Sequence, residues 1–269
     1  LPTYLASVHA TSSLLVALTM TFGFMVKTPL YLVHVWLPKA HVEAPVAGSM
    51  ILAGVLLKLG SYGLMVFLPF FTHKLLMIYI YVSVIGGVLC CFTCVRQWDA
   101  KGLIAYSSVV HMGVVSVGVV TGSELGYYCA MVMVIAHGIC SPLLFGLAFY
   151  LYTCSHTRLL AQNRGTTSMP LVCFFIFALL AVNMGLPPFL NVWAEVLMFS
   201  ALCAIMLSSL PFLLASAFFG VLYNLAMYTM LAHGKESPAV AVTNSPWHYI
   251  SSLMLSLLLS FNTSMLYIM

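Results

Sequence analysis

Charged side chains are scarce in this sequence. Asp, Glu, Lys and Arg make up 5% of its 269 residues, whereas 63% are hydrophobic and the mean hydropathy is +1.10. A soluble domain carries about 25% charged residues, so this chain lacks the polar side chains to cover a water-facing surface. Its formal charge of +4 is too small and too dispersed to indicate nucleic-acid binding. The composition predicts a membrane protein without a nucleic-acid partner.

Metal-binding motifs are also poorly represented. Cys90, Cys91 and Cys94 lie close together, but no second cysteine pair at a ligand-like spacing follows, so packing is favoured over a metal or cluster site. His41 and Glu43 form the H-x-E half of a zinc-deaminase signature, but the P-C-x-x-C half is missing. Dinucleotide, cluster and haem motifs are not found either. We therefore expect no metal and no cofactor in this chain.

Long apolar segments dominate what is present. A membrane-spanning helix needs about 20 mostly apolar residues. Eight segments meet this requirement, with prolines in the first, fifth and sixth that predict broken or kinked helices. The segments are 11–37, 47–69, 74–95, 102–121, 125–152, 169–200, 204–231 and 247–268. The fold class predicted is an all-α, polytopic membrane protein with about eight transmembrane helices.

Basic residues in the joints between spans support this count. The joints after odd-numbered spans contain Lys39, Arg96, Lys101, Arg158, Arg164 and Lys235. The joints after even-numbered spans contain only Lys74. This asymmetry is typical of a membrane protein whose odd-numbered joints face the compartment of synthesis. A miscounted span would have scrambled the pattern.

Three ionisable residues interrupt the apolar spans. They are Lys27, Lys58 and Glu195. A charge at the centre of the bilayer costs about 2.5–3.5 kcal/mol on insertion scales, so three of them indicate a function. His111 and His137 add two titratable groups in the fourth and fifth spans, where either packing or proton transfer would explain a histidine.

Prolines occur close to these ionisable residues. Pro29 follows Lys27, Pro142 follows His137, and the pair Pro187-Pro188 precedes Glu195. Each proline leaves a backbone carbonyl without its helical donor, which a membrane protein tolerates where that backbone is buried or lines a wet cavity. The combination favours a polar proton path through the bilayer over ordinary kinks.

Several of these residues lie in segments that resemble one family. Residues 27–64 (KTPLYLVHVWLPKAHVEAPVAGSMILAGVLLKLGSYGL), 96–113 (RQWDAKGLIAYSSVVHMG), 136–145 (AHGICSPLLF) and 183–195 (NMGLPPFLNVWAE) are similar to the subunit 4 family of mitochondrial NADH:ubiquinone oxidoreductase, respiratory complex I. The phrase HVWLPKAHVEAPVAGS separates this family from the antiporter-like subunits 2 and 5. The resemblance weakens beyond about residue 200.

The resemblance implies a fold and a set of roles. The spans would match helices seven to fourteen of the antiporter-like fold, with broken helices at Pro29 and at Pro187-Pro188. The family's proton-transfer residues would be Lys27, Lys58, His111, His137 and Glu195. The function implied is proton translocation coupled to NADH:ubiquinone electron transfer. NADH, FMN, iron-sulfur clusters and ubiquinone would be bound by other subunits.

The resemblance also implies an organisation and partners. Residues 1–72 would be the last two helices of a first inverted repeat, 73–232 a complete second repeat, and 233–269 a final transmembrane helix. The family's first six helices, with the glutamate that pairs with the position of Lys27, are expected on a separate chain; the alternative is that this sequence is part of one longer subunit. Subunits 2 and 5 and membrane lipids are the other partners expected, in the mitochondrial inner membrane.

Two other functions remain open from the sequence. Subunits of sodium/proton antiporters share the fold and the lysine and glutamate pattern, and a structural remnant of the membrane arm would need no channel of its own. The remaining charged residues of the first joints have simpler interpretations. Glu43 is expected in the loop after the first span, and Arg96, Asp99 and Lys101 as surface or headgroup charges. Packing or an interfacial position is expected for Trp36, Trp98, Trp193 and Trp247.

Overall fold

The computed structural model describes residues 14–68 and 73–234, and this part of the chain is helical without a named strand. The α-helices are α2 (Leu14–Lys27), α3 (Trp36–Glu43), α4 (Val46–Ile51), α5 (Leu57–Phe67), α6 (His73–Val95), α7 (Ala100–Val120), α8 (Glu124–Ser155), α9 (Pro170–Met184), α10 (Leu190–Ile205) and α11 (Leu210–Ala232). A π-helical segment, η1 (Leu52–Leu56), joins α4 to α5. Short 3-10 turns are η3 (Leu160–Gln162), η4 (Thr166–Ser168) and η5 (Leu207–Ser209).

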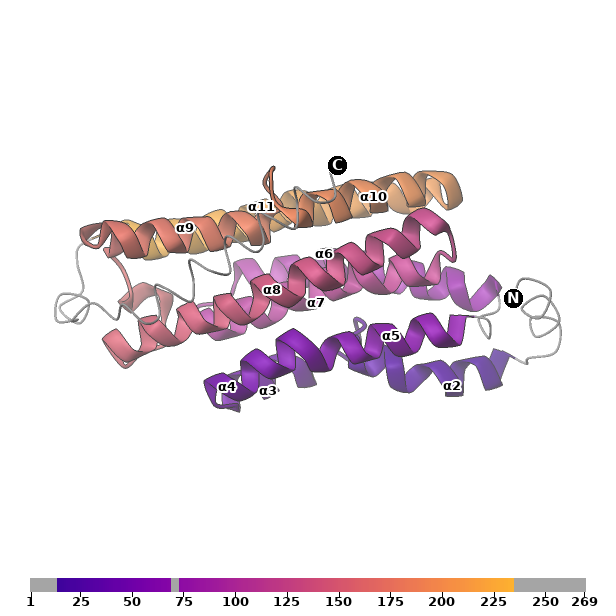
Figure 1. The fold of residues 1–269 in the computed structure, drawn as a ribbon, viewed down its shortest axis with the longest axis horizontal. Helices are drawn as coiled ribbons and strands as arrows, with labels where there is room; N and C mark the ends of the chain where they lie inside the picture. Colours follow the sequence, from indigo (N-terminus) through magenta and orange to yellow (C-terminus); the bar gives the residue numbers. More distant parts are fainter. Residues whose placement is uncertain (1–13, 69–72, 235–269) are drawn as a thin grey trace.

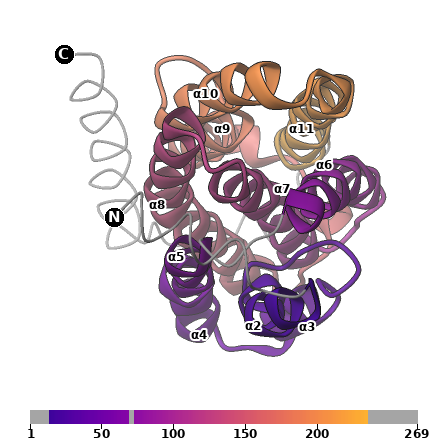
Figure 2. The same ribbon diagram turned by 90° about the vertical axis from the view of Figure 1, so that its right-hand side faces the viewer.

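The helices lie roughly side by side along the long axis of the molecule, and α7 occupies the centre (Figures 1 and 2). Helices α6 and α8 flank α7, while α10 packs on α8 and α11 on α6. Almost every residue of α7 is buried. An apolar helix without a polar face can be stable only when other helices or lipid surround it. Helix α7 is therefore the central helix of the bundle, and its buried residues include His111.

Local signals fix where the helices begin. The Asp99 carboxylate accepts from the backbone N–H of Lys101 at the start of α7, and the Ser123 hydroxyl accepts from that of Gly126 at the start of α8. Such side-chain acceptors satisfy backbone donors that lack a helical partner. Pro170 begins α9, where the missing N–H costs nothing.

The predicted break near Pro29 is confirmed. Helix α2 ends at Lys27, and the chain leaves the helical conformation until Trp36, with Leu32 at a φ of 85°. The Trp36 indole N–H donates to the carbonyl oxygen of Val26 over 3.1 Å. A side chain therefore satisfies one carbonyl that the interrupted helix leaves open, and Trp36 serves as a packing residue.

The predicted break at Pro187-Pro188 is confirmed as well. Helix α9 ends at Met184 and α10 begins at Leu190, so the two form an interrupted rod along one face of the molecule (Figure 1). Gly185 ends α9 with a φ of 72°, a region that glycine enters without strain. The Asn191 amide donates to the carbonyl oxygen of Val182 over 2.7 Å, which ties the start of α10 back to the end of α9.

Other expectations need correction or lie outside the described residues. The fifth span is not broken: α8 continues through Pro142 as one helix. Glu43 is the last residue of α3 and not part of a loop. The predicted span 247–268 and Trp247 lie outside the described residues. Within the described residues, five helices are long and apolar enough to cross a membrane, and three shorter helices are apolar.

Candidate functional site

Lys58 and His137 form the first contact of an internal polar line. Lys58 Nζ lies 2.8 Å from His137 Nδ1 and also donates to the carbonyl oxygen of Ala53. Ala53 belongs to η1, the π-helical segment directly before Lys58. Single-turn π segments change the helical hydrogen-bonding pattern and often occur at functional sites. The π segment thus places a backbone acceptor where the Lys58 ammonium needs one.

Small residues let the two helices of this pair approach closely. A Cβ atom added at Gly54 would lie 3.2 Å from Cγ of Pro142 and 3.8 Å from the carbonyl oxygen of Gly138. A Cβ atom added at Gly138 would lie 3.7 Å from Cε of Lys58. Close packing through small residues is a common way for membrane helices to associate. Here it brings the Lys58 side chain from η1 and α5 against α8, where His137 lies.

The line continues from His137 to His111 on α7. The centroids of the two imidazole rings are 5.7 Å apart, and their exposed fractions are 1% and 4%. His111 Nε2 is buried and has no hydrogen-bond partner among the described residues. A buried polar atom without a partner is costly unless water or a transient proton satisfies it.

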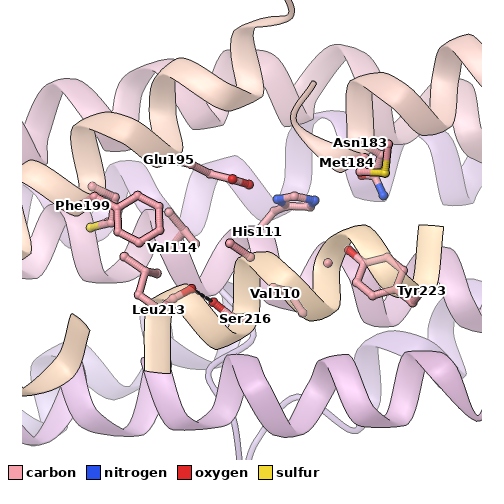
Figure 3. Close-up of a pocket in the computed structure, with 13 residues that line it drawn as sticks. Val110, His111, Val114, Asn183, Met184, Glu195, Phe199, Leu213, Ser216 and Tyr223 are labelled. Atoms are coloured by element: carbon pink, nitrogen blue, oxygen red, sulfur yellow. Dashed lines mark hydrogen bonds between the residues drawn. The ribbon is translucent and has the colours of Figure 1, made fainter. Parts of the chain in front are cut away.

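A cavity beside His111 supplies room for that water. Asn183, Glu195 and Tyr223 also line it, so α7, α9, α10 and α11 all contribute to it (Figure 3). The cavity offers about 20 Å³ to the centres of water molecules, whereas a single ordered water needs roughly 10–15 Å³. Figure 3 shows the carboxylate of Glu195 directed toward the His111 ring.

The broken helix makes space for the Glu195 carboxylate. A Cβ atom added at Gly185 would lie 3.4 Å from each of the two carboxylate oxygens. Close by, the Asn183 amide donates to Asn224 Oδ1 over 2.9 Å. The end of α9 therefore has a glycine beside the Glu195 carboxylate and an amide pair that fixes Asn183.

Lys27 does not join this line in the described residues. Its side chain is exposed, although a Cβ atom added at Gly60 would lie 2.9 Å from Cβ of Lys27. The structure thus brings together four of the five predicted residues: Lys58, His137, His111 and Glu195. Lys27 lies beside the same helix as Lys58, but its side chain is exposed in this bundle.

Two further residues near the line were missed or misjudged. His41 on α3 is fully buried, stacks on Phe145 at 4.4 Å between ring centroids, and has no hydrogen-bond partner for either ring nitrogen among the described residues. Burial, followed by the charges of Lys101 and Lys58, lowers the pKa of His41 to about 4. Lys101 was expected to be a surface or headgroup charge, and its 5% exposure rules out an open surface position. Charged residues flank both positions in the sequence, which therefore gave no signal of their burial.

The cysteines of the CCFTC segment lie inside the bundle. Cys90, Cys91 and Cys94 of α6 are all fully buried, and the Cys91 thiol lies 3.6 Å from the carbonyl oxygen of Ser216. The described residues contain no group of three His, Cys, Asp or Glu side chains that could hold a metal ion. In this part of the chain the thiols act as small apolar side chains.

Comparison with protein-family models shows which family this chain belongs to. A family model described as "NADH:quinone oxidoreductase/Mrp antiporter, TM" matches residues 3–223. The chain belongs to this family. Membership establishes a multi-pass membrane protein, in agreement with the five long apolar helices.

Curated relatives carry the name of one subunit of that family. NADH-ubiquinone oxidoreductase chain 4 of Ceratitis capitata is 44% identical over 239 residues, which are 86% of this chain and 53% of the relative. The protein of the same name from Aedes aegypti is 46% identical over 225 residues, 81% of this chain and 50% of the relative. This chain therefore spans about half the length of the curated relatives it matches.

Solved structures show the same antiporter-like fold. Respiratory complex I from Thermus thermophilus with bound NADH aligns over 91% of this chain and 54% of its own, with a TM-score of 0.80 and 23% identity. An archaeal membrane-bound sulfane sulfur reductase aligns over 96% and 46%, with a TM-score of 0.86 and 20% identity. At these identities the likeness concerns the fold alone.

Proposed function

We propose that this chain translocates protons as part of subunit 4 in the membrane arm of respiratory complex I. The observation that carries the proposal is the line from half-buried Lys58 through buried His137 and His111 to the cavity at Glu195. Titratable groups inside a membrane bundle are typical of proton relays. The names of the curated relatives point to NADH:ubiquinone oxidoreductase as the enzyme that this chain serves.

The Lys58–His137 pair would act as a proton-sharing unit. Two positive charges at 2.8 Å repel strongly in a medium of low dielectric constant. When Lys58 holds a proton, His137 is favoured as the neutral acceptor, and a proton that moves to His137 leaves a neutral amine behind. The carbonyl oxygen of Ala53 holds the amino group in either state. Only one extra proton then occupies the pair at a time.

The second half of the line would carry the proton from His137 to Glu195. The imidazole centroids are 5.7 Å apart, a separation that one bridging water or a ring reorientation can cross. From His111 the water-sized cavity leads to the Glu195 carboxylate (Figure 3). A carboxylate there can accept a proton and release it when the local field changes.

Lys27 would serve in the part of the path that precedes Lys58. Its exposed position in this bundle leaves the ammonium available to an acidic residue from the family helices that precede residue 1. Under this proposal α2 to α5 complete a first inverted repeat with those helices, and α6 to α11 form the second repeat. Lys27 would then be buried against its counter-ion in the assembled subunit.

The complex would lie in the mitochondrial inner membrane, with the antiporter-like subunits 2 and 5 among its neighbours. The named relatives support this placement. A cation/proton antiporter subunit is the alternative, since the matching family also includes Mrp antiporters. The segments shared with subunit 4 favour complex I over that alternative.

The test is coupled proton pumping by the assembled complex in sealed proteoliposomes. Lys58→Met should abolish NADH-driven proton uptake or lower it at least tenfold, whereas Lys39→Met, which removes an exposed charge on α3, should leave it unchanged. Normal pumping by Lys58→Met would refute the proposed line. Sodium-dependent proton exchange without NADH would support the antiporter alternative instead.

The separate chain expected for the first six family helices needs its own measurement. Mass spectrometry of the purified complex gives the intact mass of this polypeptide. A mass near 29.4 kDa, together with a second chain that carries six spans, would support two polypeptides. A mass larger by six helices would place all helices on one polypeptide and leave the proton line as proposed.

A further inference from the structure

A second cavity opens at the end of the bundle where α3 ends, α7 begins and α8 ends. It offers about 500 Å³ to the centres of water molecules, which lies within the range of roughly 300–1,000 Å³ of ordinary ligand sites. Lys101, Arg158 and Tyr152 contribute its basic and aromatic lining. The cavity is distinct from the Lys58–Glu195 line and lies at the end that carries most of the basic joints.

Two cationic side chains share this cavity. Lys101 is 5% exposed, and its Nζ donates to the carbonyl oxygen of Ala44 over 3.3 Å. Arg158 Nη1 donates to the carbonyl oxygen of Val42 over 2.9 Å. The two residues are close enough for the charge of one to act on the other. Each cation still has N–H groups beyond the single bond that anchors it.

Nearby carboxylates form no ion pair with either cation among the described residues, although the charge of Asp99 acts on Lys101. Glu43 also lines the cavity, but within residues 14–68 and 73–234 no ion pair joins it to Lys101 or Arg158. Asp99 accepts the backbone N–H of Lys101 and caps α7. The positive charges of Lys101 and Arg158 repel each other, and a negatively charged group bound between them would offset that repulsion. The geometry thus provides a cradle for a negatively charged group.

Apolar side chains form the other wall of the cavity. Pro45, Val46 and Phe149 line it, and the ring of Tyr152 lies 5.6 Å from the Arg158 guanidinium carbon. A free inorganic anion would gain nothing from such a wall. An amphiphile would, because its charged group can meet the cations while its glycerol and first methylene groups contact the apolar side.

We propose that this cavity binds the phosphodiester headgroup of one anionic phospholipid, with Lys101 and Arg158 as its ligands. Basic pockets between membrane helices on the positively charged side are suited to such headgroups. The Arg158 fork would bind two phosphate oxygens, and Lys101 would contribute a compact charge from the floor of the cavity. The lipid would also hold the ends of α3, α7 and α8 together.

The experiment uses the assembled complex, depleted of lipid in detergent and titrated with phosphatidylglycerol. Native mass spectrometry counts the retained lipids at each concentration. The wild type should retain one phosphatidylglycerol. Lys101→Gln and Arg158→Gln should each lower the affinity for this lipid by about tenfold or more, because each removes a charge-assisted contact. Arg158→Lys should bind at an intermediate level. Arg96→Gln, which removes an exposed charge near the start of α7, is the matched control and should bind like the wild type.

Each alternative occupant has its own result. If inorganic phosphate displaces phosphatidylglycerol as well as the lipid itself does, the cavity is a site for free anions. If phosphatidylcholine is retained as well as phosphatidylglycerol, the site does not select for net negative charge. Either result overturns the proposal. A photo-cross-linker at Tyr152 that captures another subunit, and not labelled phosphatidylglycerol, would show a protein occupant and also overturn it. Unchanged retention in both glutamine variants would place the lipid elsewhere. Arg158→Lys, which keeps the charge, shows whether any loss reflects misfolding, since a merely destabilised complex would not regain lipid with it.

Discussion

Lys58 Nζ and His137 Nδ1 lie 2.8 Å apart, although 79 residues separate them in the chain. The contact depends on the approach of η1 and α5 to α8, which Gly54, Gly138 and Pro142 permit. The backbone fixes the position of both residues. The π segment determines where Lys58 lies along its helix, and the continuous helix α8 does the same for His137. Packing at three small or rigid residues thus controls the central step of the proposed proton path.

Gly54→Leu should separate these helices and weaken proton pumping. A Cβ atom at residue 54 already lies 3.2 Å from Pro142, and a leucine side chain has no space to extend. We expect pumping in proteoliposomes to fall by about tenfold, since an ångström-scale displacement of reacting groups can cost that much or more. Gly146→Leu, on α8 where a Cβ atom would meet nothing within 4 Å, is the control. Equal loss in both variants would mean that helix stability, and not the Lys58–His137 distance, limits pumping.

Glu195→Gln should block transfer at the far end of the line. The substitution keeps the size of the side chain in the cavity beside His111 but removes the carboxyl group that can accept and release a proton. Proton uptake driven by NADH should fall at least tenfold. Glu195→Asp keeps the acid but shortens the side chain, and should retain part of the activity. Pumping by the glutamine variant at the wild-type level would remove Glu195 from the path.

Much of this architecture could be predicted from the sequence, for identifiable reasons. The breaks after Lys27 and Met184 follow from prolines that cannot donate a backbone hydrogen bond, and the long apolar runs determine where helices occur. Of the two effects predicted for Pro142, a break or a kink, α8 excludes the break, because a proline inside a membrane helix is tolerated when neighbouring groups satisfy the freed carbonyl.

The positions of individual side chains were harder to predict. Lys101 follows a polar joint and has the appearance of a surface charge, yet tertiary packing of α3 and α8 buries it. Lys27 lies in an apolar segment and suggests burial, yet in this bundle it is exposed. Sequence periodicity shows which residues share one helix, but it does not show which helix covers them. The π segment before Lys58 carries no composition signal.

Gly185→Ala should disturb the surroundings of the Glu195 carboxylate while the carboxylate itself is kept. Gly185 has a φ of 72°, where a residue with a Cβ atom is strained by about 1–2 kcal/mol. The new methyl group would also lie 3.4 Å from both carboxylate oxygens and displace water around them. We expect a lower melting temperature and reduced pumping of the complex. Gly146→Ala, in open space, should show neither effect, whereas a normal Gly185→Ala variant would indicate that the α9–α10 break adjusts freely.

His41 should make the stability of the complex depend on pH. Its pKa in the folded protein is about 4, below the usual value of about 6.5 expected in the unfolded chain. Between these values the unfolded state binds more protons, so stability is fully present above pH 6.5 and is lost as the pH falls toward 4. The loss amounts to at most about 3.4 kcal/mol.

His41→Leu should remove this contribution, because leucine keeps an apolar contact with Phe145 and does not titrate. Thermal unfolding in detergent between pH 7 and pH 4.5, followed through the melting temperature, measures the difference. The wild type should lose stability more steeply on acidification than the variant. His156→Leu, an exposed histidine at the end of α8, is the control and should keep the wild-type slope. Parallel curves for wild type and His41→Leu would mean that the pKa of His41 is the same in the folded and the unfolded protein, which would contradict the lowered pKa given above.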